Sequence, residues 1–199
     1  HLYSEVLQKF RLAAQGKGIS RKPPEHLKAR IAQFFDPLPF FYEPLEAQQT
    51  DLTAYPLRAI TQRPMAMYHA WDSQNAWLRQ IHAHNHLFVN PGVARAAGIE
   101  DGGWMWVESP WGKVRCLCSY SEAVEPGTVW TWNAIGKAPG AWNLAPDANE
   151  SQRGFLLNHL IAEELPGASG GRISNSDPIT GQAAWYDVRV RILPAASDE

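Results

Sequence analysis

The sequence predicts a mainly β fold with inserted helices, in the form of a closed or partly closed barrel that follows a helical and extended arm. Short alternating apolar segments recur between residues 57 and 193, whereas the longer helical patterns are confined to residues 2–35. A proline-rich stretch over residues 36–56 separates these two regions. We therefore expect residues 1–56 to pack elsewhere and residues 57–199 to form the barrel.

The arm begins with two helical patterns. Apolar residues follow a helical spacing over Leu2–Ala14, and a second helix is expected within Pro23–Phe35. The following prolines and a polar EAQQTD run are typical of a linker or of a chain draped over another surface. The first residues lack the apolar stretch and cleavage site of a signal peptide. A chain that opens on His rather than Met is expected to be a fragment or a processed product.

The centre of the chain defines the barrel scaffold. Asn90 is expected to cap a helix that begins at Pro91, because proline at the first helical position loses no intrahelical bond. Gly98 tolerates the left-handed backbone that ends such a helix. Two strands should follow, over residues 104–107 and 113–120, separated by a Ser-Pro-Trp-Gly turn. The other expected elements are strands over residues 57–61, 128–132 and 185–193, a helix over 73–81 and a short helix or turn over 154–161.

Two cysteines and several tryptophans occupy these strands. Cys116 and Cys118 share a strand face with Val114 and Tyr120, and their separation by one residue would strain a mutual disulfide. They are expected to be buried thiols, since two thiols are also too few for a four-ligand zinc site. Among nine tryptophans, the pairs 104/106 and 130/132 should fill a core or an interface with a larger body, and Trp71 or Trp185 could stack on a planar ligand.

The composition excludes two classes of partner. The net charge is -2, and basic and acidic residues are interspersed, so no extended basic face for nucleic acid is expected. No apolar run approaches the roughly 20 residues that span a bilayer, so the chain is not expected to insert into a membrane. These features predict a soluble part of a protein and leave its compartment open.

The polar stretch from Thr61 to Asn75 is the first candidate site. It follows a strand and precedes a helix, so its side chains and the N–H groups at the helix start should gather at one end of the sheet, where anions such as pyrophosphate bind. A phosphate-rich ligand fits such a loop, although an ordinary polar loop explains the same residues. The candidate donors are Thr61, Arg63, His69, Ser73, Gln74 and Asn75.

The tail supplies a second group of candidate residues. A turn over residues 177–181 places the Gln182 amide at the entrance to the last strand, free to bind the edge of a heterocycle. Asn158 and His159 lie among apolar residues, and a ligand is one partner that such buried polar groups would need. We expect this tail and the Thr61–Asn75 loop to converge on one pocket.

Two other patterns carry weaker alternatives. His82, His84 and His86 alternate and would point to one side of an extended segment, as metal ligands could, but no acidic cluster or cysteine nearby completes a site. Ser73 near His69 suggests a nucleophile with its base, yet no nucleophile-elbow motif surrounds it. We therefore expect neither a metal site nor a hydrolase triad in this chain.

Taken in order, these motifs resemble the C-terminal domain of the large subunit of molybdopterin oxidoreductases, the dimethyl sulfoxide reductase family. The resemblance covers approximately residues 57–193 and combines five motifs, each weak alone, in the family's order. One departure is Gly103, where the family usually has an Asp. The motifs are Thr61-x-Arg63, His69 with Ser73–Asn75, the Asn-Pro helix and Gly-Ile-x-Asp-Gly turn within Asn90–Val107, Pro126-Gly127, and Asn158-x-Leu160 with Asp177–Gly181.

The resemblance implies a six-stranded double-psi β-barrel that caps a bis(molybdopterin guanine dinucleotide) cofactor with molybdenum. Residues 1–56 would be the end of the preceding domain and its connecting arm, and residues 57–199 the cofactor-binding domain. The implied cofactor-binding residues are Thr61, Arg63, His69, Ser73, Gln74 and Asn75 towards the dinucleotide, and Asn158, His159 and Gln182 near a pterin. Trp71 is also expected to bind the cofactor.

The ending SDPITGQAAWYDVRVRI, together with NAWLRQI after the polar loop, looks most like the branch of polysulfide, thiosulfate and tetrathionate reductases and cytoplasmic sulfite dehydrogenases. The family's iron–sulfur motif and molybdenum ligand lie in earlier domains and have no counterpart here, so the chain alone should be inactive and hold no catalytic residue. The implied partners are the rest of the same subunit, an iron–sulfur electron-transfer subunit and a membrane anchor subunit, in the cytoplasm. The alternative is a non-enzymatic double-psi barrel that serves as an interaction or substrate-recognition module.

Overall fold

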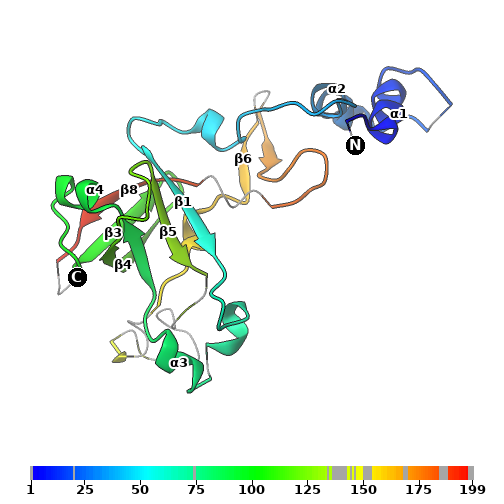
Figure 1. The fold of residues 1–199 in the computed structure, drawn as a ribbon. Helices are drawn as coiled ribbons and strands as arrows, with labels where there is room; N and C mark the ends of the chain where they lie inside the picture. The colour runs from blue at the N-terminus through cyan, green and yellow to red at the C-terminus, as the bar shows by residue number, and fades with distance from the viewer. Residues whose placement is uncertain are drawn as a thin grey trace.

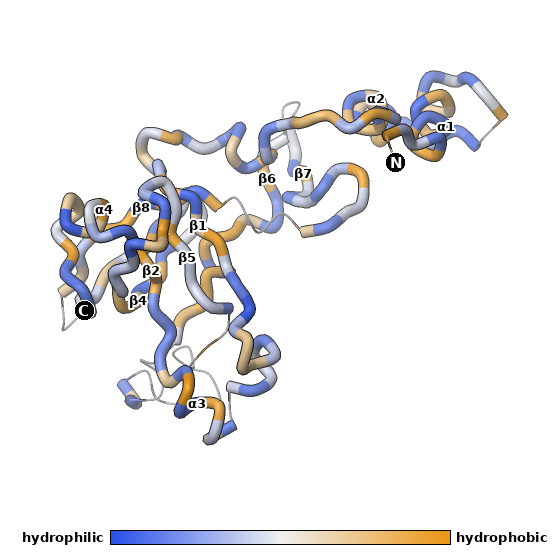
Figure 2. Tube along the Cα trace, viewed as in Figure 1, coloured by the Kyte–Doolittle hydropathy of each residue, from blue (hydrophilic) through white to orange (hydrophobic). Residues whose placement is uncertain are grey.

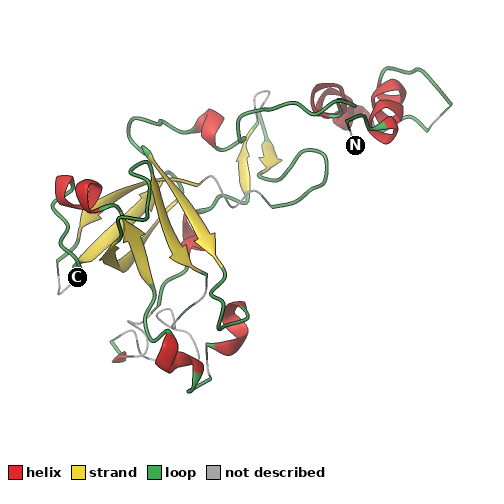
Figure 3. Ribbon diagram, viewed as in Figure 1, coloured by secondary structure: helices red, strands yellow, loops and turns green. Residues whose placement is uncertain are grey.

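The computed structural model describes residues 2–19, 21–73, 75–133, 135, 143, 145, 147–149, 154–167, 170–183 and 188–196. Figure 1 shows a barrel of strands and an arm of helices that extends away from it. Strands dominate the barrel, and the helices around it are short (Figure 3). The mainly β fold with inserted helices is therefore confirmed.

Six strands close into a barrel in the order β1-β5-β2-β4-β3-β8, which confirms the predicted strand number. The pairs β1–β5 and β2–β4 run parallel, and the other neighbours run antiparallel. Each parallel pair joins strands that are separated along the chain, because a short hairpin cannot connect parallel partners. The strands are β1 (Leu57–Gln62), β2 (His86–Val89), β3 (Trp104–Ser109), β4 (Gly112–Tyr120), β5 (Thr128–Trp132) and β8 (Val188–Pro194).

Alternating residues of these strands fill the barrel interior. On β4, Val114, Cys116 and Cys118 are buried as predicted, and both cysteines are free thiols. Burial raises the pKa of the Cys116 thiol far above its ordinary value and that of Cys118 to about 11. Both thiols are therefore protonated at neutral pH and act as small apolar side chains. Other fully buried residues are Ala59, Leu87, Val89, Met105, Val107, Val129, Val188 and Val190.

The tryptophan pairs of β3 and β5 lie on the outer face of the barrel. The guanidinium of Arg115 lies 4.1 Å from the ring centre of Trp104, and Lys113 Nζ lies 4.1 Å from that of Trp106. On β5, Trp130 stacks on a phenylalanine of β2 at 4.2 Å. The prediction that these pairs fill the core is wrong, because the alternate positions of both strands point inward. The alternative, that they pack against a larger body, stays a prediction.

The helix between β2 and β3 forms as predicted. Asn90 Oδ1 accepts a hydrogen bond of 3.0 Å from Gly92 N and caps α4 (Pro91–Ala96). Gly98 has a φ of 72°, the left-handed conformation that ends a helix. These local signals fix where α4 begins and ends without help from the rest of the fold.

The helix expected over residues 73–81 is shorter than predicted. Only Leu78–Ile81 (α3) is α-helical, after a 3-10 turn η3 over His69–Asp72. Asn75 Oδ1 accepts hydrogen bonds from Trp77 N at 3.0 Å and from Leu78 N at 3.4 Å. A polar side chain that binds the first N–H groups in this way starts a helix at that point.

The arm is helical and then extended, as predicted, and apolar segments run along it (Figure 2). Its helices are α1 (Glu5–Ala14) and α2 (Lys28–Phe34), with the 3-10 turn η1 (Glu25–Leu27) before α2. A salt bridge of 2.6 Å between Arg11 and Asp36 ties the end of α1 to the chain after α2. Within the described ranges, no helix combines the length and the apolar character needed to cross a bilayer.

The tail packs against the arm through a small sheet that the sequence did not predict. β6 (Glu164–Pro166) pairs with β7 (Arg172–Ser174), in a segment for which no strand was expected. Gln49, which ends the 3-10 turn η2 (Ala47–Gln49), donates to the Pro166 carbonyl at 3.0 Å. Asn175 donates to the buried Glu46 carboxylate at 3.0 Å, so the arm lies on this sheet as a draped chain would.

Replacement of a fully buried barrel residue should destabilise the chain. Leu87 on β2 has no exposed surface, and Leu87→Ala should lower the free energy of unfolding by about 2–5 kcal/mol through lost burial and a residual cavity. Urea denaturation measures this difference. The control is Leu52→Ala at a leucine that is 48% exposed, where a change of less than about 0.5 kcal/mol is expected. Equal effects at both positions would contradict the assignment of the barrel core.

Candidate functional site

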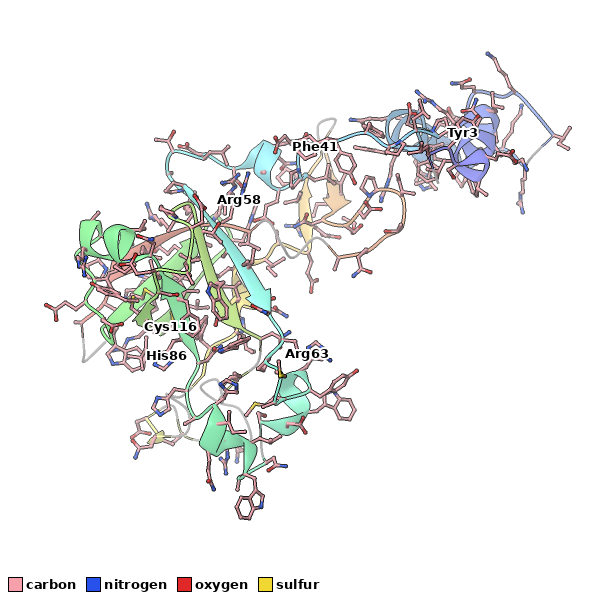
Figure 4. The ribbon with its side chains drawn as sticks, viewed as in Figure 1. Tyr3, Phe41, Arg58, Arg63, His86 and Cys116 are labelled. Carbon is pink, nitrogen blue, oxygen red and sulfur yellow. The ribbon has the colours of Figure 1, made fainter. Side chains whose placement is uncertain are left out.

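The ends of β1 and β5 meet at one end of the barrel, where the candidate polar loop begins. The two strands are parallel, with Gln62 opposite Trp132 at their last positions. The next residue after β5, Asn133, donates its backbone N–H to the Gln62 carbonyl at 2.8 Å. Arg63 lies at this end of β1 and Arg58 near the other end (Figure 4). The loop is therefore anchored on one side by β1 and on the other by Asn133.

His69 is held in an unusual position within this loop. Its φ is 51°, a left-handed conformation that few residues other than glycine adopt. Its Nδ1 lies 3.1 Å from Asn133 Nδ2, and its ring packs edge-on against Tyr68 with 5.1 Å between ring centres. The Asp72 carboxylate accepts the Tyr68 backbone N–H at 2.7 Å, which closes the turn around His69. Backbone conformations of this kind persist where surrounding contacts hold them, and they are frequent at functional sites.

The other predicted residues of the loop occupy different environments. Thr61 is half-buried and in phase with the inward-facing residues of β1, whereas Arg63 is exposed, with its guanidinium 6.0 Å from the Tyr68 ring centre. Trp71 is 74% exposed, and Ser73 is buried. Asn75 caps α3, while Gln74 and the tail residue Trp185 lie outside the described residues. The structure thus gathers Thr61, Arg63, His69 and Trp71 on one loop and gives Asn75 a structural contact.

The three alternating histidines line a shallow pocket beside this loop. The pocket has a volume of ≈ 300 Å³, and its walls include Trp132 and the imidazoles of His82, His84 and His86. The rings of His84 and His86 stack with 6.1 Å between their centres. Burial, and then the neighbouring His84, lower the pKa of His86. The described part of the chain contains no group of three or more His, Cys, Asp or Glu residues placed to hold a metal ion.

Asn158 and His159 are exposed, so the prediction that they are buried polar groups is wrong. They lie in the 3-10 turn η6 (Leu157–Leu160), whose first and last residues are buried. Residues three apart share one side of a 3-10 turn, which leaves the two polar residues between them on the other side. The backbone of η6 packs so closely on β4 that a Cβ added to Gly112 would lie 2.1 Å from the His159 carbonyl oxygen.

The turn before Gln182 forms as predicted, but it lies against the arm. Asp177 N donates to the Gln182 carbonyl at 2.7 Å. Arg30 Nε donates to the Pro178 carbonyl at 2.9 Å, and the Tyr42 hydroxyl donates to Asp177 Oδ2 at 2.8 Å. These contacts clamp the turn to the arm, whereas the Thr61–Asn75 loop lies below the barrel in the same view (Figure 1). The expected convergence of the two segments does not occur within this chain.

The charges in this clamp depend on one another. Burial alone would raise the pKa of Asp177, but hydrogen bonds from the Thr180 N–H, the Tyr42 hydroxyl and the Thr180 hydroxyl outweigh it and hold the pKa below its ordinary value. Burial and the bond to Asp177 raise the pKa of Tyr42 to about 12. The ionised carboxylate and the neutral phenol therefore stabilise each other across the physiological range.

Sequence reasoning missed Asn133, Arg30 and Tyr42. Asn133 is a single polar residue directly after a strand, and only the parallel pairing of β1 with β5 brings it to His69. Arg30 and Tyr42 lie in the arm, more than 130 residues before the turn that they contact. The carbonyls that Arg30 binds, for example, are 147 and 148 positions further along the chain. No local pattern could have indicated these long-range contacts.

Comparison with known proteins gives a consistent result. Residues 57–176 match the family model described as molydopterin dinucleotide binding domain. A sulfite dehydrogenase subunit from Allochromatium vinosum is 69% identical over the whole chain, and a tetrathionate reductase subunit from Archaeoglobus fulgidus is 26% identical over the whole chain. The chain spans 21% and 17% of the lengths of these two relatives.

A solved structure supports the fold. Acetylene hydratase from Pelobacter acetylenicus matches 80% of this chain with 22% of its own, at a TM-score of 0.60 and 20% sequence identity. At this identity the likeness concerns the architecture alone. The architecture described above is thus shared with part of acetylene hydratase.

Removal of the Tyr42 hydroxyl should loosen the Asp177–Gln182 turn. Tyr42→Phe deletes one hydrogen bond to a partly exposed carboxylate, so local opening should become easier by about 1 kcal/mol. Amide hydrogen exchange of residues 177–182 measures the change. The control is Tyr3→Phe, at an arm tyrosine that is 53% exposed. Equal exchange in both variants would contradict the clamp.

The same clamp should weaken in acid. Because the folded pKa of Asp177 lies below its unfolded value, its contribution is present above about pH 4 and is lost as the pH falls through the folded value. The difference in unfolding free energy between the wild type and Asp177→Asn should therefore be larger at about pH 7 than at about pH 3 in urea titrations. A difference independent of pH would show that the carboxylate charge contributes nothing.

Proposed function

We propose that this chain, which belongs to the molydopterin dinucleotide binding domain family, holds a molybdopterin guanine dinucleotide cofactor as part of a larger molybdenum oxidoreductase. The match begins at Leu57, the first residue of β1, and includes the whole polar loop that His69 and Asn133 organise. This coincidence of the family match with a built polar loop is the observation that carries the proposal. We place the division between the arm and the cofactor domain at residue 57.

The residues at the end of β1 fit such a cofactor. Arg63 supplies an exposed cation and Thr61 a hydroxyl at the barrel rim, donors that phosphate oxygens accept. Trp71 offers an exposed aromatic face of the kind on which a planar ring stacks. Asn133 Oδ1 is buried and has no hydrogen-bond partner within the described ranges. An unpaired buried acceptor costs about 1–3 kcal/mol, which a donor from a bound group would offset.

The chain would bind and orient the cofactor, while the cofactor supplies the chemistry. Thr61, Arg63 and His69 would bind the dinucleotide portion, and Gln182 the pterin portion. When bound, the molybdenum centre provides oxygen-atom or sulfur transfer coupled to electron transfer. We assign no catalytic residue to this chain.

The relatives support an inorganic sulfur compound as the substrate. One is named a sulfite dehydrogenase subunit and one a tetrathionate reductase subunit, and the first is 69% identical. We therefore propose a substrate such as sulfite, thiosulfate or polysulfide for the complete protein, with two dinucleotides per molybdenum. We further propose an iron–sulfur cluster in the rest of the subunit, iron–sulfur and membrane anchor subunits as partners, and a cytoplasmic location. These relatives favour this function over a non-enzymatic interaction module.

Loss of the loop donors should lower cofactor content. In the full-length protein, His69→Ala or Arg63→Ala removes a donor to a charged group, so retained cofactor should fall by about tenfold or more under competitive washing. Molybdenum and guanine nucleotide per protomer, measured after acid release, report the retained cofactor. Arg58→Ala is the matched control, because Arg58 is an exposed arginine near the other end of the same strand (Figure 4). Equal content in all three variants would contradict the proposed site.

A further inference from the structure

We infer that Asn133 is a positioning residue that fixes the protonation of His69, so that His69 offers a permanent N–H donor at Nε2 to the dinucleotide. This inference rests on the proposed function, because the dinucleotide is the group that would accept the bond. Nothing in the sequence motifs or in the family match singles out Asn133. The contact between the two side chains singles it out.

The backbone holds Asn133 in place to act on His69. Its N–H is bonded to the Gln62 carbonyl at 2.8 Å, directly beyond the last pair of β1 and β5. Its amide nitrogen lies 3.1 Å from His69 Nδ1. Its Oδ1 is buried away from solvent. The amide is thus oriented with its donor group towards the imidazole.

An amide N–H can only donate, so His69 Nδ1 must accept. A neutral imidazole carries one proton, and acceptance at Nδ1 leaves that proton on Nε2. In the protonated ring Nε2 also carries a proton, so an Nε2–H donor is present in both charge states. His69 is exposed, and this donor is therefore accessible to a ligand. A phosphate, which accepts but does not donate when ionised, suits such a group.

Among the described residues, the charged groups linked to His69 by these contacts lie on its own loop. Tyr68 packs on the ring, Arg63 lies over Tyr68, and Asp72 binds the Tyr68 backbone N–H. From β5 the facing group is the neutral Asn133 amide, next to Trp132, which packs in turn against His82. Asn133 is thus the group in direct contact with Nδ1, and its replacement should control the tautomer.

The isosteric variant Asn133→Asp tests this role. A carboxylate accepts, so neutral His69 would place its proton on Nδ1 and lose the Nε2 donor, whereas protonated His69 would keep both. Histidine changes charge between about pH 5 and 8. Full-length Asn133→Asp should therefore retain cofactor at about pH 5.5 and retain about tenfold less of it at about pH 8.5. In the wild type the Nε2 donor is present at both values, so its retention should change far less between them than that of Asn133→Asp. Retained molybdenum and guanine nucleotide after buffer exchange are the readout.

Two further variants complete the test. Asn90→Asp is the control, since Asn90 follows β2 at the other end of the barrel. This variant keeps the Oδ1 acceptor of the cap on Gly92 and loses only the bond that Asn90 Nδ2 donates to the Val124 carbonyl at 3.0 Å, away from the loop. Adding His69→Gln to Asn133→Asp supplies an amide donor that does not titrate, and this double variant should retain cofactor at both pH values.

The outcomes separate this inference from the proposed function. Equal retention by Asn133→Asp at both pH values, equal loss at both, or failure of the double variant to restore retention would each overturn the role of Asn133. In those cases the proposed function stands if the wild type holds the dinucleotide and His69→Ala does not. A wild-type protein that holds no dinucleotide would overturn both.

Discussion

The parallel pairing of β1 with β5 is the constraint on which the candidate site depends. It brings the carboxyl ends of two strands that are far apart in the sequence to one end of the barrel, as parallel pairing does in other ligand-binding sheets. The loop that leaves β1 then meets Asn133, which leaves β5. This contact joins those of Tyr68 and Asp72 around His69, whose backbone is in the left-handed conformation. The buried residues of the closed barrel keep the two strand ends in register.

A second set of contacts joins the arm to the tail. Arg30, Tyr42 and Glu46 bind the segment from Asn175 to Pro178, and mutual stabilisation of Tyr42 and Asp177 is visible in the opposite directions of their pKa shifts. The arm is thus the support of the Gln182 turn and not merely a connector. If Gln182 binds one end of an extended cofactor, the arm and the barrel each present one part of the binding surface.

Local signals predicted most of the fold, and long-range contacts account for what they missed. The Asn90 cap, the Gly98 terminator and the inward faces of β4 and β8 follow from neighbouring residues. The sheet of β6 and β7, and the choice of which alternating face of β3 and β5 points inward, depend on tertiary packing, which no local pattern contains. For the site, the sequence indicated the loop of His69 but not Asn133, since the strand order that joins them is a property of the closed barrel.

A structure of the full-length protein with its cofactor tests the central claim most directly. The account predicts that atoms of the dinucleotide portion lie within hydrogen-bond distance, about 3 Å, of His69 Nε2 and of at least one of Thr61 and Arg63. The Asn133 amide should still contact His69 Nδ1 in that structure. A cofactor that touches none of these residues, with the loop covered instead by another part of the protein, would contradict the account.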